Sequence, residues 1–315
     1  MLIAFMFPGQ GSQIIGMGKD VAEEFRAAKD IYEEVDSVLG FALSKLIWEG
    51  EKEELTLTIN AQPAIMATSL AVVAALKSEG IDIASSLCVA GHSLGEYSAL
   101  CAAGSLSLAD TALLLRERGQ YMQEAVPLGQ GSMAAILGLN YSDLANIAKT
   151  AAKNEVCQAA NDNDPSQVVV SGHKSAVERA IEIAKAAGAK RAVLLPVSAP
   201  FHSELMAPAS LEMKDALSTI PIQEPVIPLV SNVKALAVTL PDEIRSLLVE
   251  QVTGVVRWRE SVEWMARNGV TEMWEIGAGR ALSGMVRRIN RSISCVTISK
   301  PEEVKTAIIS QSEGM

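Results

Sequence analysis

Residues 87–103, with the sequence LCVAGHSLGEYSALCAA, predict a buried strand that turns sharply into a helix. Leu87–Ala90 is a short apolar run ended by Gly91, and Leu94–Ala103 has the pattern of a helix. The turn between them fits G-x-S-x-G, the motif that presents a serine at the start of a helix. Glycine and serine frequencies give about 0.1 chance match per chain, so the strand-to-helix context carries most of the weight. Ser93 is therefore a candidate nucleophile, because free N–H groups at a helix start favour an oxyanion.

A serine nucleophile needs a base, and the chain has three histidines. His92 lies inside the turn and is predicted to point away from Ser93, so we interpret it as structural. His173 follows a predicted strand, where we expect it to be exposed. His202 lies where the chain leaves a predicted small domain, and junctions between domains line clefts, so His202 is the predicted base. No Asp or Glu stands out as its partner, which leaves a dyad and a triad equally open.

Strands and helices alternate through both ends of the chain. Leu2–Phe7 is a buried apolar run that ends in the loop Pro8–Gln13. Further strands are predicted at Pro228–Ser231, Glu272–Ile276 and Ile293–Ile298. Helices are predicted at Val21–Leu39, Ala61–Glu79, Pro241–Gln251, Trp258–Asn268 and Arg280–Arg288. This alternation predicts an α/β fold with a parallel sheet covered by helices on both faces.

The middle of the chain has a different rhythm. Between Ser132 and Val197 the predicted order is strand, helix, strand, strand, helix, strand, with a turn at Asn161–Pro165. That order is the split βαβ, or ferredoxin-like, pattern. We therefore predict one catalytic domain made of residues 1–127 and 198–315, with a small domain of residues 128–197 inserted in it.

Composition narrows the class of protein. Of 315 residues, 49% are hydrophobic and 20% are charged, the reverse of a disordered chain. With 27 basic and 37 acidic residues the net charge is −10, which argues against a surface that binds nucleic acid. The four widely spaced cysteines favour free thiols in a reducing compartment. Leu2–Phe7 and the other apolar runs are too short to span a membrane, and no signal peptide is expected, so we predict a cytoplasmic protein.

Two groups of basic residues have more than one interpretation. Residues 277–300 contain no acidic residue but five basic ones: Arg280, Arg287, Arg288, Arg291 and Lys300. They form either a solvated helix face or a patch for an acidic partner, and the sequence favours neither. Arg116 and Arg118 lie on the helix after the serine turn, where an arginine is usually a surface charge. If buried, it would clamp a carboxylate.

The loop Gly9–Gln13 resembles a phosphate loop only superficially. Ile14 occupies the third glycine position of G-x-G-x-x-G, and no Gly-Lys-Ser/Thr follows. Loops after the first strand often lie beside the nucleophile in such sheets. A role as a backbone hydrogen-bond donor next to Ser93 suits this loop better.

Taken together, several spaced motifs resemble the malonyl-CoA:acyl carrier protein transacylases over nearly the whole chain. The motifs are Phe7–Gln13, Gly91–Tyr97, Arg118-Gly119, Met122-Gln123, Gln167–Gly172, Pro200–Ser203 and Gln251. The resemblance implies an α/β-hydrolase-like domain with a ferredoxin-like insertion. It also implies malonyl-CoA and acyl carrier protein as partners, with no metal and no cofactor, since the coenzyme A thioester is a substrate. We expect a monomer.

The same resemblance assigns roles to residues. It implies that Ser93 is acylated by malonyl-CoA, that His202 is its base, and that Arg118 pairs with the malonyl carboxylate. Backbone N–H groups of Gln10 and Leu94 would form the oxyanion hole. The resemblance further implies that Gln251 orients the histidine, that Asn161 lines the site, and that Phe201 selects malonyl over methylmalonyl groups.

Three functions compete at this point. The first is a transacylase that works by a ping-pong route through an acyl-Ser93 ester. The second is a serine hydrolase, such as a thioesterase or a lipase, which the Ser93–His202 pair would equally allow. A buried Arg118 would favour the first, because a lipase pocket would leave that cation desolvated and unpaired. The third is a noncatalytic binding module, which the presence of both Ser93 and His202 disfavours.

Overall fold

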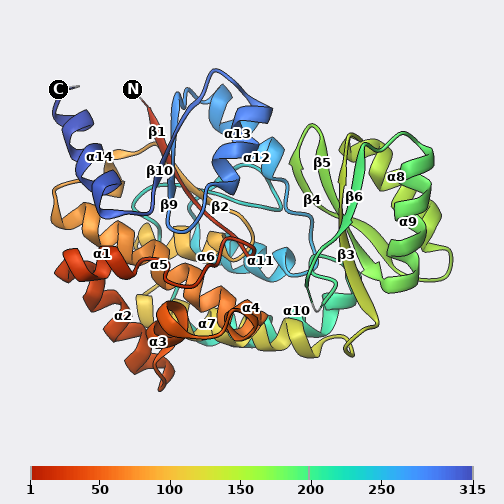
Figure 1. Ribbon diagram of the computed structural model, residues 1–315, viewed down its shortest axis with the longest axis horizontal. Helices are drawn as coiled ribbons and strands as arrows, with labels where there is room; N and C mark the ends of the chain where they lie inside the picture. The colour runs from red at the N-terminus through yellow and green to blue at the C-terminus, as the bar shows by residue number, and fades with distance from the viewer. Residues whose placement is uncertain (1, 198, 314–315) are drawn as a thin grey trace.

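The computed structural model describes residues 2–197 and 199–313, which form a mixed α/β protein with two separate sheets (Figure 1). The larger sheet has the strand order β10-β9-β1-β2-β7-β8, and every neighbouring pair is parallel except β7 and β8. Its strands are β1 (Ile3–Phe7), β2 (Cys88–Gly91), β7 (Leu229–Val230), β8 (Ala237–Val238), β9 (Glu272–Ile276) and β10 (Ser294–Ile298). The predicted parallel sheet is confirmed.

Strand β1 shows why this sheet is covered on both faces. Phe5 and Phe7 pack into a large hydrophobic cluster on one face, while Ala4 and Met6 belong to a second cluster on the other. Successive side chains of a strand point to opposite faces, so a continuous apolar run needs cover on both. Two helices pack against that second face: α12 (Trp258–Arg267) and α13 (Ala281–Ile289). Helix α14 (Pro301–Glu313) lies against α5 and β10 and buries Val304 and Ala307 in the larger cluster.

The larger cluster lies under the remaining helices around this sheet. These are α1 (Lys19–Glu24), α2 (Arg26–Leu39), α3 (Leu43–Glu49), α4 (Lys52–Thr56), α5 (Thr58–Ser78), α6 (Gly95–Ala102), α7 (Leu108–Glu124), α10 (Ala207–Thr219) and α11 (Pro241–Gln251). The helix predicted over Val21–Leu39 is broken in two, because Phe25 adopts an extended conformation with φ −111° and ψ 114°. Its ring is buried in the larger cluster, and this burial accompanies the break.

Helix α5 corrects the expectation that no segment approaches a membrane span. By length and composition it is the one helix among the described residues that is long and apolar enough to cross a bilayer. However, 83% of its most apolar window is buried inside the protein, as in a core helix. Its sequence is not an uninterrupted apolar run, because it contains the polar residues Asn60, Gln62, Thr68 and Ser69.

The smaller sheet is antiparallel, with the order β4-β5-β3-β6. It contains β3 (Gly131–Leu137), β4 (Cys157–Asp164), β5 (Gln167–His173) and β6 (Arg191–Leu194), with α8 (Tyr141–Ala152) and α9 (Lys174–Ala186) on one face. The six predicted elements appear in the predicted order. The other face of the sheet, including Met133 and Val169, packs into the larger cluster. Residues 1, 198 and 315, which limit the predicted domain ranges, lie outside the described residues.

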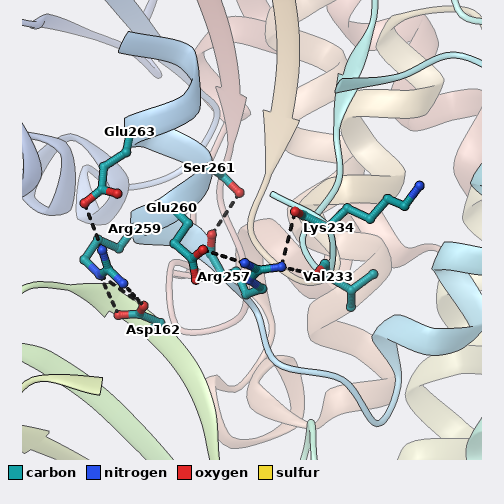
Figure 2. A network of polar contacts seen from close by, with 8 residues as sticks. All are labelled: Asp162, Val233, Lys234, Arg257, Arg259, Glu260, Ser261 and Glu263. Atoms are coloured by element: carbon teal, nitrogen blue, oxygen red, sulfur yellow. Dashed lines mark hydrogen bonds and ion pairs between the residues drawn. The ribbon is translucent and has the colours of Figure 1, made fainter. Parts of the chain in front are cut away.

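The turn predicted at Asn161–Pro165 begins too early: β4 continues through Asp164, and the turn falls at Pro165 and Ser166. Turn-forming residue types hold an extended strand here because their side chains are buried against the larger part of the molecule. Figure 2 shows Asp162 reaching Arg259 of α12, with three nitrogen-to-oxygen contacts of 2.8–3.2 Å. Asp164 accepts a hydrogen bond of 2.7 Å from Nε of Arg288 on α13. Tertiary ion pairs thus override the local preference for a turn.

Further polar contacts hold the side chains of Arg259 and Arg257 in place (Figure 2). Glu263 pairs with the far side of the Arg259 guanidinium at 2.9 Å. Arg257 bonds Glu260 and the backbone carbonyl of Val233. Burial raises the pKa of Asp162, and the Arg259 cation acts in the opposite direction. The carboxylate therefore depends on its partner to stay charged in this place.

We expect Asp162→Ala to lower the free energy of unfolding by about 1–3 kcal/mol, because it removes the acceptor of a partly buried arginine. Urea denaturation measures the loss. The matched control is Glu182→Ala, which breaks the exposed pair with Lys185 and should cost less than about 0.5 kcal/mol. Equal effects of the two substitutions would show that the pair between Asp162 of β4 and Arg259 of α12 does not stabilise the packing of the smaller sheet against the larger part of the molecule.

Candidate active site

A pocket of about 310 Å³ opens where the carboxyl ends of β1 and β2 face the smaller sheet. Its wall includes the loop Pro8–Gln13, the turn His92–Leu94, residues of β4, and residues 195–197 and 201–202. Helix α13 closes one side with Ala281, Leu282 and Met285. Ligands of parallel α/β sheets bind at this end of the strands. Among the described residues no cluster of His, Cys, Asp or Glu could hold a metal ion.

The serine turn is held by close packing and by one asparagine. Ser93 has φ 54°, a strained value for a residue with a side chain. A Cβ on Gly91 would lie 1.9 Å from the carbonyl oxygen of Gly95, so the turn requires glycine there. Asn232, which follows β7, accepts a hydrogen bond from Ser93 N at 2.8 Å and donates one to Gly91 O at 2.6 Å. These contacts fix Ser93 at the start of α6.

His202 lies beside the serine hydroxyl. Its Nε2 is 2.8 Å from Ser93 Oγ, and its Nδ1 is 2.8 Å from the backbone carbonyl oxygen of Gln251. Because a carbonyl oxygen only accepts, Nδ1 carries the hydrogen and Nε2 presents its lone pair to the hydroxyl. No carboxylate bonds this ring within the described part of the chain. The pair is therefore a dyad oriented by a backbone carbonyl.

The imidazole is held in its neutral form. His202 is buried, and burial together with the nearby Arg118 cation lowers its pKa to about 3. A neutral ring at neutral pH is the form that accepts a proton from Ser93 Oγ. The geometry and the neutral state of His202 let it act as a general base, and its lowered pKa makes it a weak one in the empty pocket.

Arg118 is buried, with 1% of its surface exposed, so the interpretation as a surface charge is wrong. Its Nη1 donates to Gln62 Oε1 at 2.6 Å, and its Nη2 donates to Gln251 Oε1 at 2.8 Å and to Ser93 Oγ at 3.2 Å. Its Nε has no hydrogen-bond partner within the described residues. The guanidinium lines the pocket, and its Nη2 lies beside the nucleophile, where an anionic group could pair with it.

Arg116, two residues before Arg118 on α7, lies in a different environment. It is half-buried and lies outside the pocket, with its guanidinium over the ring of Phe41 and hydrogen-bonded to the backbone carbonyl of Ile59. Residues two apart on a helix face different directions. Only the second of the two arginines therefore reaches the pocket.

Two backbone N–H groups are available beside Ser93. Gln10 and Leu94 both line the pocket, and neither backbone N–H has an acceptor within residues 2–197 and 199–313. The Gln10 side chain donates to Thr58 Oγ1 at 3.0 Å, which anchors the loop against α5. Paired N–H groups of this kind form an oxyanion hole when a carbonyl carbon is bonded to Ser93 Oγ.

Gln251 connects the histidine to the arginine. Its backbone carbonyl bonds His202, and its side-chain oxygen accepts from Arg118. Its side-chain nitrogen donates to Ser93 O at 2.9 Å and to Glu96 Oε2 at 2.6 Å. The sequence predicted that Gln251 orients the histidine, and the structure brings it there through its main chain.

The remaining predicted residues lie as follows. Asn161 and Phe201 are buried and line the pocket. His92 bonds Asn163 Oδ1 at 2.9 Å through Nε2, which ties the serine turn to β4. His173 is half-buried at the end of β5, outside the pocket, where Nδ1 accepts from Val156 N at 2.9 Å.

Sequence reasoning missed four residues of this site: Gln62, Glu96, Asn163 and Asn232. Asn232 had a usable signal, because it directly follows a buried strand of the parallel sheet, at the edge where ligands bind. Gln62 had none, since a polar residue inside a long apolar helix is compatible with many environments. Glu96 lay inside the quoted motif but carried no pattern that predicted its burial.

Comparisons with known proteins agree with this geometry. The family model for the acyl transferase domain matches residues 4–277. A malonyl CoA-acyl carrier protein transacylase of Bacillus subtilis is 48% identical, over 97% of this chain and 96% of that protein. Among solved structures, an acyl-carrier-protein S-malonyltransferase from Bartonella henselae has 53% identity and a TM-score of 0.97, covering 99% of this chain and all of that one.

A second solved structure is a type II PKS acyl-carrier protein in complex with its malonyl-transacylase. It has 40% identity and a TM-score of 0.96, and the match covers 98% of this chain and all of that chain. The family match spans most of the sequence and includes the serine turn, the arginine and the histidine of the pocket. The chain therefore belongs to the acyl transferase domain family.

Proposed function

We propose that the protein transfers a malonyl group from malonyl-CoA to the phosphopantetheine thiol of acyl carrier protein, supplying fatty-acid chain elongation. The observation that carries this proposal is the buried Arg118 guanidinium, which lines the pocket with its Nη2 3.2 Å from Ser93 Oγ. A buried cation that contacts no carboxylate directly is costly unless an anion binds it. The names of the similar proteins support the same acyl group and the same acceptor.

The reaction follows a ping-pong course. Ser93 Oγ attacks the thioester carbonyl carbon while His202 Nε2 takes the hydroxyl proton, and the N–H groups of Gln10 and Leu94 bind the resulting oxyanion. The carbon–sulfur bond then breaks, and coenzyme A leaves with the proton held by His202. Transfer to the carrier protein runs the same steps in reverse, with its thiol as the attacking group.

The malonyl carboxylate also affects the base. Arg118 is one of the causes that lower the pKa of His202. A carboxylate bound to Arg118 offsets that cation and raises the basicity of the imidazole. An acetyl group lacks the carboxylate, so it meets a weaker base and leaves the cation unpaired.

The domain boundaries, the cellular location and the oligomeric state belong to the same proposal. We assign residues 1–127 and 198–315 to an α/β-hydrolase-like domain and residues 128–197 to an inserted ferredoxin-like domain. The protein acts in the cytoplasm as a monomer, binds neither nucleic acid nor membranes, and uses no cofactor. The free thiols of its cysteines support a reducing compartment.

Mixing the protein with malonyl-CoA should give a covalent malonyl adduct by mass spectrometry, and Ser93→Ala should abolish it. His202→Ala should acylate at least ~10²-fold more slowly, the lower range for loss of a positioned base. The matched control is His173→Ala, which should acylate like the unmodified protein. Rapid release of free malonate without transfer to carrier protein would identify a hydrolase instead.

Replacing Arg118 should change which acyl group is preferred. A charge-assisted pair with a carboxylate contributes about 1.5–3 kcal/mol, so Arg118→Ala should lose about ten- to a hundredfold in malonyl over acetyl selectivity. Arg118→Lys should restore little, because one ammonium does not reproduce the planar fork. Transfer rates with malonyl-CoA and acetyl-CoA side by side measure this.

Arg116→Ala is the control for that experiment, because its guanidinium lies outside the pocket. It should keep the selectivity of the unmodified protein. An Arg118→Ala protein with the unmodified preference for malonyl-CoA would contradict the assignment of Arg118.

The carrier protein docks, in this proposal, beside helix α13. Ala281 and Met285 of this helix line the pocket, and Arg280, Arg287 and Arg291 are exposed nearby. Within the described part of the chain these three arginines have no ion-pair partner, whereas Arg288 pairs with Asp164. Unpaired basic residues on and beside α13, in a protein of net charge −10, favour the approach of an acidic partner to this helix.

Reversing Arg287 and Arg291 to Glu should raise the apparent KM for carrier protein and leave malonyl-CoA kinetics unchanged. The effect should shrink at high salt, because screening weakens long-range attraction. Arg288 is kept, since its pair with Asp164 is structural. Unchanged carrier kinetics at low salt would place the docking surface elsewhere, with Lys190 and Arg191 as the next residues to reverse.

A further inference from the structure

Glu96 is a buried carboxyl group directly behind the reacting residues. It lies in the first turn of α6, three residues after Ser93, with 1% of its surface exposed. Its Oε2 accepts from Gln251 Nε2 at 2.6 Å, and its Oε1 accepts from Asn232 N at 3.2 Å. Both donors also hold the site, since Asn232 bonds Ser93 N and Gln251 bonds Arg118 and His202. A carboxyl group this close to the chemistry takes no part in the mechanism above.

The hydrogen bonds of Gln251 give Glu96 a positioning role. A side-chain amide can flip, and its orientation follows the partners on each side. Arg118 only donates, so it requires the amide oxygen, and an ionised Glu96 only accepts, so it requires the amide nitrogen. The two charges therefore fix one orientation of Gln251, in which Oε1 holds the guanidinium against the pocket.

The charges of the site also need balance. The titratable groups around Glu96 and its partner Gln251 are Arg118 on α7, Tyr97 on α6 and His202 in the segment before α10. Tyr97 and His202 are neutral at neutral pH, because burial raises the pKa of the tyrosine to about 12 and lowers that of the histidine. In the empty pocket, Arg118 and Glu96 thus form one cation and one anion joined through Gln251. A bound acyl carboxylate adds a second anion to the same cation.

We propose that Glu96 is a positioning and charge-balancing residue of the acyl site: it orients Gln251 toward Arg118 and takes up a proton when a substrate carboxylate binds that arginine. This inference rests on the proposed malonyl transfer. Two anions near one buried cation cannot both stay ionised at low cost, and the one without direct contact to the cation protonates more readily.

The surroundings of Glu96 suit an exchange of this proton. Burial raises its pKa to about 7, while Gln251, Asn232 and Arg118 act in the opposite direction. The hydroxyl of Ser231 is buried without a hydrogen bond in the described structure and is close enough to influence this carboxyl group. It can accept the acid hydrogen on Oε1, while Oε2 continues to accept from Gln251.

The test measures proton uptake on binding. In a Ser93→Ala background, which binds without reacting, malonyl-CoA is titrated calorimetrically in buffers of different ionisation enthalpy. At about pH 7.5 we expect roughly half a proton more to be taken up with malonyl-CoA than with acetyl-CoA. Acetyl-CoA is the matched ligand, because it carries the same phosphates but no acyl carboxylate. Equal uptake with the two thioesters would overturn the proposal.

Substitutions at Glu96 then identify the group. Adding Glu96→Gln should remove the extra uptake and make malonyl-CoA binding independent of pH between about 6 and 8, whereas with Glu96 binding weakens as pH rises. In the protein with Ser93, Glu96→Gln should raise KM for malonyl-CoA more than it changes acetyl transfer, because Gln251 is free to flip. Glu96→Asp keeps the acid and should restore part of the uptake.

The outcomes separate this inference from the proposed function. If the unmodified protein forms no malonyl adduct, malonyl transfer itself fails. If it forms the adduct but the extra uptake persists in Glu96→Gln, another group takes the proton and the role of Glu96 is refuted. Should Glu96→Gln not fold, as judged by thermal unfolding, the pH at which uptake is half-maximal must still shift in Glu96→Asp, and an unshifted value refutes the inference.

Discussion

The contact between the Arg118 guanidinium and the side chain of Gln251 is the interaction on which the pocket depends. It places a cation in a buried position beside Ser93, and it connects that cation to the main chain that orients His202. A buried guanidinium needs most of its donors satisfied, and Gln62 and Gln251 supply two neutral acceptors without cancelling its charge. The nucleophile, its base and the anion site therefore form one hydrogen-bonded unit, in which moving any member strains the others.

The two sheets are needed to assemble that unit. Ser93 lies in the turn after β2 and Arg118 on α7, whereas His202 and Gln251 come after the smaller sheet in the sequence. The smaller sheet supplies the opposite wall of the pocket, and Asp162 and Asp164 pair it with α12 and α13. Because α13 also lines the pocket, these ion pairs stabilise the pocket as well as the fold.

Much of the fold was predictable because it depends on local patterns. The serine turn, the strand-helix alternation and the six elements of the smaller sheet follow from apolar periodicity and glycine placement. The failures share a cause: β4 was cut short at Asn161–Pro165, and Gln62 and Glu96 were overlooked, because their partners are distant in sequence. A polar residue whose partner lies more than fifty positions away gives no local signal, as the pairs Gln62–Arg118 and Glu96–Gln251 illustrate. Ser93 was predicted from a motif, His202 from its place at a domain junction, and the role of Arg118 from the family resemblance. None of these states which hydrogen bonds hold the three residues.

The same arrangement explains how the buried Arg118 cation, which is unfavourable in the empty pocket, can select between acyl groups. Arg118 lowers the pKa of His202 and so weakens the base of the empty site, and its burial costs solvation. Under the proposed function, a substrate carboxylate removes both penalties in one contact, since it pairs the cation and lets the imidazole accept a proton more readily. Selectivity is then expressed in the rate of acylation as well as in binding, because a thioester without the carboxylate reaches the same serine but meets a site that is electrostatically incomplete. A neutral pocket of the same shape would bind both acyl groups and distinguish them poorly.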